Sequence, residues 1–121
     1  MPGSYLLDTN VIIYAINQRL TVPIGHYGIS IITEMELLSF PRLTAQEESQ
    51  IRLLCREFER FGISDPVKRL AIDIRRKTAM KLPDSIISAT AVEHQFTLVT
   101  NDPRLAEHHP SIALSLEELM R

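Results

Sequence analysis

Short apolar runs alternate with helix-spaced apolar stripes along the chain. The first run covers residues 5–7 and ends at Asp8, and apolar residues then recur at helical spacing over residues 11–16. This pattern predicts a strand, a turn and a helix. Residues 17–26 include Asn, Pro and Gly and predict a loop. Residues 27–31 predict a second strand, which leads almost directly into a helix from Thr33 to about residue 40.

The rest of the chain repeats this alternation. Thr44 and Glu47 match a capping box, and the helix they open carries an apolar stripe made of Ile51, Leu54, Cys55, Phe58 and Phe61. We then expect a very short strand within residues 62–66, helices over about residues 67–79 and from residue 83, and a strand over residues 96–99. A helix after Asp102, a strand over residues 112–114 and a short C-terminal helix complete the pattern. Such alternation predicts an α/β fold with a mostly parallel central sheet of about five strands, flanked by helices.

Composition narrows the class of protein. We expect residues 1–121 to form a single domain, since no repeat, low-complexity stretch or linker divides them. Thirteen Lys and Arg against 15 Asp and Glu give a net charge of −2, which argues against binding nucleic acid through bulk positive charge. The single Cys55 excludes an internal disulfide or a multi-cysteine zinc site, and we expect it in the core. No apolar run approaches membrane-spanning length, so we expect a cytoplasmic protein without membrane contact.

Four acidic residues fall near predicted helix starts: Asp8, Glu36, Asp84 and Asp102. Each has an ordinary interpretation when it is considered alone. Asp8 and Asp102 suit N-caps, with Pro following Asp102, and Glu36 would complete a capping box with Thr33. Asp84 would be stabilised by the positive end of its own helix.

Considered together, the same acids predict a metal site. The carboxyl ends of parallel strands meet at one sheet edge, where open α/β sheets bind ligands. Several carboxylates in one cleft repel each other, and Mg²⁺ or Mn²⁺ is the cation that such oxygen ligands suit. A site of this kind can hydrolyse a phosphodiester, with a carboxylate helping to deprotonate the attacking water. Helix geometry places Glu36 beside the apolar stripe and turns Glu34 towards solvent, so we expect Glu36 to be the ligand.

Four segments resemble a known family: Leu6-Leu7-Asp8-Thr9-Asn10-Val11, Ile29-Ser30-Ile31-Ile32-Thr33 with Glu36-Leu37, Leu82-Pro83-Asp84-Ser85-Ile86-Ile87-Ser88-Ala89-Thr90-Ala91, and Thr97-Leu98-Val99-Thr100-Asn101-Asp102. In this order they look like a PIN domain, and more narrowly like the VapC-type toxins of bacterial toxin–antitoxin pairs. The resemblance implies a three-layer PIN-like fold and a Mg²⁺- or Mn²⁺-dependent endoribonuclease. It also implies a cognate antitoxin as partner and a homodimer.

The family's acidic quartet maps onto Asp8, Glu36, Asp84 and Asp102. Asn10 and Thr100 match polar positions that lie beside the metals in such proteins. The segment between the first helix and residue 27 is shorter than expected of the family.

Two other functions stay open at this point. Asp8-Thr9-Asn10-Val11 nearly fits the start of a haloacid-dehalogenase-type phosphatase, in which Asp8 would be the nucleophile, although Asn10 stands where a second Asp is needed. A non-catalytic binding module with the same fold is the other alternative.

Two groups of charged or titratable residues are ambiguous. Lys68, Arg69, Arg75, Arg76, Lys77 and Lys81 form the densest basic stretch. This stretch fits either a solvated helix face or a rim that guides phosphates towards Asp84. His108 and His109 precede Pro110 in a predicted loop, and we expect both at the surface.

Overall fold

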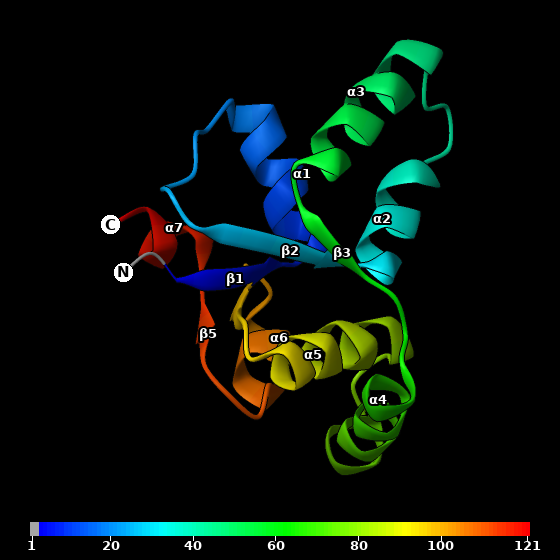
Figure 1. Cartoon of the computed structure of the whole chain (residues 1–121), viewed down its shortest axis with the longest axis vertical. Helices are drawn as coiled ribbons and strands as arrows, with labels where there is room; N and C mark the ends of the chain where they lie inside the picture. The colour runs from blue at the N-terminus through cyan, green and yellow to red at the C-terminus, as the bar shows by residue number, and fades with distance from the viewer. Residues whose placement is uncertain (1–2) are drawn as a thin grey trace.

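The centre of the molecule is a five-stranded parallel sheet. The computed structural model describes residues 3–121. Its strands are β1 (Ser4–Leu7), β2 (His26–Ser30), β3 (Glu59–Phe61), β4 (Thr97–Val99) and β5 (Ala113–Leu114). They lie in the order β3-β2-β1-β4-β5, and every neighbouring pair is parallel (Figure 1). The predicted α/β fold with a central parallel sheet is therefore confirmed.

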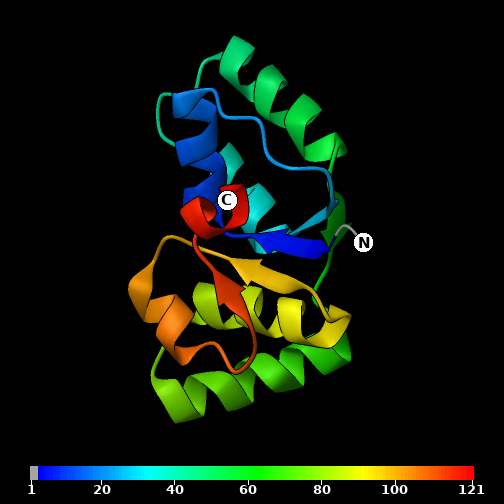
Figure 2. The ribbon, with the colours of Figure 1, turned by 90° about the vertical axis from the view of Figure 1, so that its left-hand side faces the viewer.

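Helices cover both faces of this sheet and complete three layers. They are α1 (Thr9–Gln18), α2 (Ile31–Leu38), α3 (Ala45–Arg56), α4 (Asp65–Thr78), α5 (Leu82–His94), α6 (Pro103–His108) and α7 (Leu116–Met120). Helices α1, α2 and α3 lie on one side of the sheet, and α4, α5 and α6 lie on the other (Figures 1 and 2). None of the helices formed by residues 3–121 is long and apolar enough to cross a membrane.

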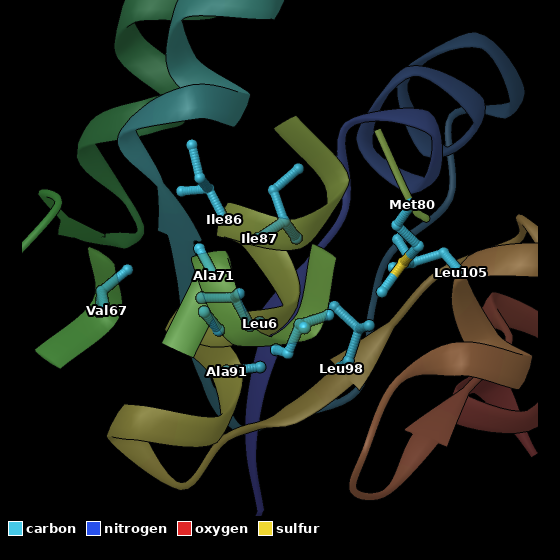
Figure 3. Close-up of a cluster of buried hydrophobic side chains, with 11 residues drawn as sticks. Leu6, Val67, Ala71, Met80, Ile86, Ile87, Ala91, Leu98 and Leu105 are labelled. Atoms are coloured by element: carbon cyan, nitrogen blue, oxygen red, sulfur yellow. The ribbon is translucent and has the colours of Figure 1, made fainter. Parts of the chain in front are cut away.

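Each face of the sheet has its own buried core, because successive strand residues point to opposite faces. Leu6 and Leu98 pack on the α4–α5–α6 side with residues such as Ile87 and Leu105 (Figure 3). Leu7 and Val99 pack on the other side, against residues of α1, α2, α3 and α7. The predicted core position of Cys55 is confirmed, since it is 1% exposed in this second cluster.

The predicted bounds of three elements are wrong. Helix α3 ends at Arg56, so Phe61 does not extend its stripe; Phe61 lies instead in β3, paired with Ser30 of β2. The short strand therefore covers residues 59–61 and not residues 62–66. Helix α2 begins at Ile31 because the Ser30 hydroxyl accepts a hydrogen bond from the Ile32 amide, which leaves Thr33 inside the helix.

The strand order creates a crevice at the carboxyl edge of the sheet. From the central β1, the chain builds β2 and β3 on one side and β4 and β5 on the other. The connections after β1 and β4 therefore diverge at this edge, which is where open parallel sheets bind ligands. Asp8 directly follows β1, and Thr100 directly follows β4.

Candidate functional site at the carboxyl edge of the sheet

Asp8 is the buried centre of the candidate site. Its side chain is the N-cap of α1 and is only 5% exposed. One carboxylate oxygen accepts a hydrogen bond from the Thr9 amide (2.8 Å), and the other accepts one from the Thr100 hydroxyl (2.7 Å). Burial nevertheless raises the pKa of Asp8 from 3.8 to about 6, since these two bonds offset only part of the desolvation. The predicted N-cap role of Asp8 is thus confirmed, and the carboxylate is held in an unfavourable environment.

Thr100 connects Asp8 to Asp102. The Thr100 hydroxyl donates to Asp8 and accepts a hydrogen bond from the Asp102 amide (3.1 Å). Asp102 is the N-cap of α6, where one of its oxygens accepts from the amides of Arg104 and Leu105. This confirms the predicted cap and leaves the second carboxylate oxygen of Asp102 outside these hydrogen bonds.

Glu36 reaches the site from α2 through a contact with Thr9. The Thr9 hydroxyl donates to Oε1 of Glu36 (2.7 Å) and lies 3.1 Å from the Thr33 hydroxyl. The predicted capping box between Thr33 and Glu36 is wrong, because α2 starts at Ile31 and Glu36 lies in its second turn. Thr33 is instead fully buried beneath Thr9 and Glu36.

The predicted solvent exposure of Glu34 is also wrong. Its side chain is 18% exposed and forms an ion pair with Arg60 of β3 (2.8 Å). Glu36, which was expected beside the apolar stripe, is the more exposed of the two glutamates. Its bond to Thr9 places Glu36 beside Asp8, whereas Glu34 belongs to the contact between α2 and β3.

Asp84 lies in the first turn of α5, on the opposite layer from α2. The element before α5 is the helix α4, so Asp84 does not follow a strand. The expectation that each acid lies at the carboxyl end of a strand therefore does not hold for Asp84. Lys81, the N-cap of α5, provides no side-chain hydrogen bond to the helix. Partial burial raises the pKa of Asp84, and the negative charges of Asp102 and Glu36 raise it further.

Electrostatic coupling links all four acids. The charges of Asp84 and Glu36 raise the pKa of Asp8, and the charge of Asp102 raises that of Asp84. These four residues come from four separate elements and span most of the chain. The fold therefore brings the predicted quartet into one neighbourhood, in which the carboxylates repel each other.

This neighbourhood has the chemistry of a divalent cation site, although the side chains are not drawn tightly together. Four carboxylates and the Thr9 and Thr100 hydroxyls give an all-oxygen donor set, which suits Mg²⁺ or Mn²⁺. Among residues 3–121, no three His, Cys, Asp or Glu side chains converge closely enough to enclose an ion. A cation bound among these carboxylates would lower the raised pKa values of Asp8 and Asp84.

Asn10 supports the loop that carries Asp102. Its side-chain oxygen lies 3.3 Å from the Asn101 amide, which donates to it, and Asn101 in turn accepts a hydrogen bond from the Leu116 amide (3.0 Å). Thr100 and Asn10 thus both lie beside the acids, Thr100 in direct contact and Asn10 through the backbone of the next loop.

Thr9 and Arg104 were not assigned to this neighbourhood from the sequence. Thr9 contacts Glu36, and the positive charge of Arg104 lowers the pKa of Asp84, as does that of Lys81 from the predicted basic stretch. Because Thr9 immediately follows the candidate ligand Asp8, its position in the sequence could have predicted that it lies at the site. Nothing local places Arg104 near Asp84, because 20 residues separate them and only the packing of α6 on α5 brings them together.

His109 corrects another prediction, since it is buried and not at the surface. It is 6% exposed, and its Nδ1 lies 2.6 Å from the Ser88 hydroxyl of α5. Its Nε2 is buried and has no hydrogen-bond partner among the described residues. Burial lowers the pKa of His109 to about 4, so this imidazole is neutral at physiological pH and holds α6 against α5.

Several solved structures have a fold similar to that of this chain. A toxin–antitoxin complex from Klebsiella pneumoniae is 28% identical, with a TM-score of 0.77 over 89% of this chain and 94% of that chain. VapBC2 from Rickettsia felis, bound to a DNA fragment from its promoter, is 22% identical, with a TM-score of 0.80 over 93% of this chain and 98% of that chain. DNA-bound VapBC from Salmonella typhimurium is 23% identical, with a TM-score of 0.77 over 96% and 99% of the two chains.

The sequence itself gives the family. No curated protein matches it. A family model described as PIN domain matches residues 5–109, a span that runs from β1 past α6 and contains all four acids. Since this match covers most of the 121 residues and the fold agrees with it, the chain belongs to the PIN-domain family.

Proposed function

We propose that this chain is a Mg²⁺- or Mn²⁺-dependent endoribonuclease and the toxin of a toxin–antitoxin pair. The observation that carries the proposal is the coupling of Asp8, Glu36, Asp84 and Asp102 at the carboxyl edge of the sheet of a PIN domain. In this proposal the four acids hold the cation directly or through water. A cation bound there supplies positive charge that stabilises the ionised carboxylates and the phosphate of the substrate.

In this proposal the acids have different roles, because their surroundings differ. Asp8 is anchored through both oxygens and therefore serves as the fixed ligand. No donor among the described residues reaches the carboxylate of Asp84, which leaves it free to accept a proton from the attacking water. That water adds to phosphorus while the bond from phosphorus to the leaving sugar oxygen breaks, and the leaving oxygen takes a proton from solvent water. Thr9 keeps Glu36 turned towards the same space.

Partner and assembly belong to the same proposal. Structures similar to this chain include a toxin–antitoxin complex from Klebsiella pneumoniae and a member of the VapBC family of toxin–antitoxin systems from Mycobacterium tuberculosis, and we extend this to a cognate antitoxin for this chain. A hollow of about 600 Å³ between α1, β2 and α3, lined by side chains such as Ile16 and Leu54, supports binding of an apolar partner segment. The homodimer implied by the family resemblance is tested by light scattering of the purified chain.

Cleavage of single-stranded RNA tests the activity. We expect cleavage with Mg²⁺ or Mn²⁺, none in excess EDTA, and a loss of at least about 100-fold in Asp8→Asn. Glu36→Gln should lose activity, whereas its matched control Glu34→Gln should cleave normally, because Glu34 pairs with Arg60 away from the site. RNA that stays intact with every divalent metal would favour the non-catalytic module. Phosphate trapped on Asp8 would favour the phosphatase, because the proposed hydrolysis forms no covalent intermediate.

A further inference from the structure

Basic side chains without a carboxylate partner among the described residues gather where α4 ends and where α5 and α6 begin. Five of the 13 Lys and Arg residues form ion pairs with carboxylates: Arg52, Arg60, Lys68, Lys77 and Arg121. The other eight have no carboxylate partner among residues 3–121. Four of these eight lie where α4 ends, α5 begins and α6 begins, and we call them the basic rim: Arg75, Arg76, Lys81 and Arg104.

Two members of the rim lie at the helix starts that carry two of the acids. Lys81 is the N-cap of α5, whose first turn contains Asp84, and Arg104 lies in the first turn of α6, which Asp102 caps. Both side chains are exposed, so each can reach a ligand that approaches Asp84 from solvent. An anion that comes to the acidic edge therefore meets positive charge on either side of it.

The backbone that presents the rim is held rigidly. Ala79 ends α4 with φ of 59°, and the Thr78 hydroxyl then accepts a hydrogen bond from the Met80 amide (3.2 Å). Both the amide and the hydroxyl of Ser85 donate to the Lys81 carbonyl. The Met80 side chain is buried beside Leu105 of α6, so the elements carrying Lys81 and Arg104 are packed together (Figure 3).

An apolar hollow adjoins the rim. It has a volume of about 220 Å³ and is lined by Ile72, Arg75, Arg76 and Leu82. Ile72 is 45% exposed and Leu82 is 50% exposed, so two apolar side chains lie open in a hollow that Arg75 and Arg76 also line. Apolar surface beside guanidinium planes is suited to the face of an unstacked base, and the guanidinium charges are suited to its phosphates.

We propose that the basic rim binds backbone phosphates of single-stranded RNA on its way to Asp84, and that the Ile72–Leu82 hollow receives one unpaired base. This inference rests on the proposed ribonuclease function and adds where the strand lies. A duplex is disfavoured because its bases are stacked and paired, and so cannot enter a side hollow. The strand runs from the end of α4, across the start of α5, to the start of α6.

Equilibrium binding to RNA tests this arrangement without cleavage. The wild-type chain in EDTA is titrated against a fluorescein-labelled single-stranded RNA of mixed sequence, and anisotropy is recorded at several salt concentrations. Each phosphate contact on a single strand contributes about 0.7 to the slope of log affinity against log salt. The double variant Arg75→Ala/Arg76→Ala should lower the slope by about 1.4 and weaken binding at least about tenfold.

Matched variants make the test specific. Lys81→Ala/Arg104→Ala should behave like the first pair. Arg42→Ala/Arg56→Ala removes two exposed charges that have no carboxylate partner within residues 3–121, one between α2 and α3 and one at the end of α3, and should leave the slope unchanged. Leu82→Ala should weaken binding at an unchanged slope and reduce the preference for single-stranded over duplex RNA. Melting curves check that each variant is folded, and glutamine in place of alanine keeps the long side chains where an alanine variant unfolds.

The outcomes separate this inference from the proposed function. Equal losses in rim and control variants, or no loss in the rim variants, would overturn the rim. An unchanged affinity in Leu82→Ala would overturn the base hollow. If the rim variants lose binding but the wild-type chain cuts no RNA with Mg²⁺ or Mn²⁺, the rim stands and the nuclease proposal fails. If wild-type and rim variants cut and bind RNA equally, the rim fails and the nuclease stands.

Discussion

Replacing Asp8 by Asn should stabilise the metal-free protein at neutral pH. Asp8 is 5% exposed, and at neutral pH it is ionised in a buried site beside other carboxylates. Asn has nearly the same shape and carries no charge. It can still accept the hydrogen bond from the Thr9 amide, but its amide group cannot accept the one from the Thr100 hydroxyl. The substitution therefore exchanges one hydrogen bond for relief of a buried charge.

The raised pKa gives the size of this effect. A pKa of about 6 in the folded chain against 3.8 for the free side chain corresponds to about 3 kcal/mol. Since the folded pKa is the higher one, folding is favoured while Asp8 is protonated. That contribution is complete below about pH 4 and is lost as the pH rises through about 6. Losing the hydrogen bond from Thr100 costs Asp8→Asn about 1 kcal/mol at every pH.

Unfolding by urea at a series of pH values, in EDTA, measures both terms. Asp8→Asn should be slightly less stable than the wild type near pH 4 and about 2 kcal/mol more stable near pH 7.5. Mg²⁺ should then stabilise the wild type and leave Asp8→Asn almost unchanged, because only the carboxylate form holds the cation.

Asp73→Asn is the matched control for this series. Asp73 is exposed on α4 and pairs with Lys77 (3.0 Å), so its loss should change stability by no more than about 0.5 kcal/mol at any pH. A stability difference between Asp8→Asn and the wild type that does not vary with pH would refute the reasoning. So would an Asp8→Asn variant that is less stable near neutral pH, since either result would mean that Asp8 is not a strained, ionised group.

Three further predictions follow from the same contacts. Thr9→Ala removes the hydroxyl that holds Glu36 and should lower the rate of RNA cleavage about tenfold, with recovery in Thr9→Ser. Thr100→Val removes a bond that lowers the pKa of Asp8, so the acid limb of the pH–rate profile should move to higher pH. Burial lowers the pKa of His109 from 6.5 to about 4, so its contribution to stability should be lost as pH falls through that range. Acid unfolding should show a shallower dependence there in His109→Leu.

The sequence predicts this fold well where one local signal decides the structure. An apolar run ending at Asp8, with helical spacing after it, has only one reasonable interpretation, and β1 and α1 follow it. Asp102 before Pro103 is equally clear, because Pro suits the first turn of a helix and Asp suits its cap. Asp8 and Asp102 lie just after the neighbouring strands β1 and β4, so they mark the edge of the sheet at which the candidate site lies.

The errors arise where two local signals compete or where a distant contact decides. Ser30 and Thr33 can both cap a helix, and the strand continues far enough for Ser30 to be the one that does. The buried positions of α2 are Thr33 and Leu37. A helical wheel that takes Ile32 as the centre of the buried face therefore places Glu34 in solvent, whereas Glu34 is partly buried and pairs with Arg60. His109 is buried by Ser88, which lies 21 residues away and leaves no trace in the sequence around His109.

The net charge of −2 is a poor guide to the partner of this protein, because the charges are separated in space. The acids of the quartet influence one another electrostatically at the sheet edge, where a divalent cation would offset their charge. Five basic residues are neutralised by ion pairs elsewhere on the surface, whereas the basic rim has no carboxylate partner within residues 3–121, and the charges of its Lys81 and Arg104 act on Asp84. An approaching polyanion responds to this local field, since charges more than about 10 Å away are screened at physiological salt. Under the proposed function, a slightly acidic chain can therefore attract RNA at the sheet edge that carries its acidic quartet.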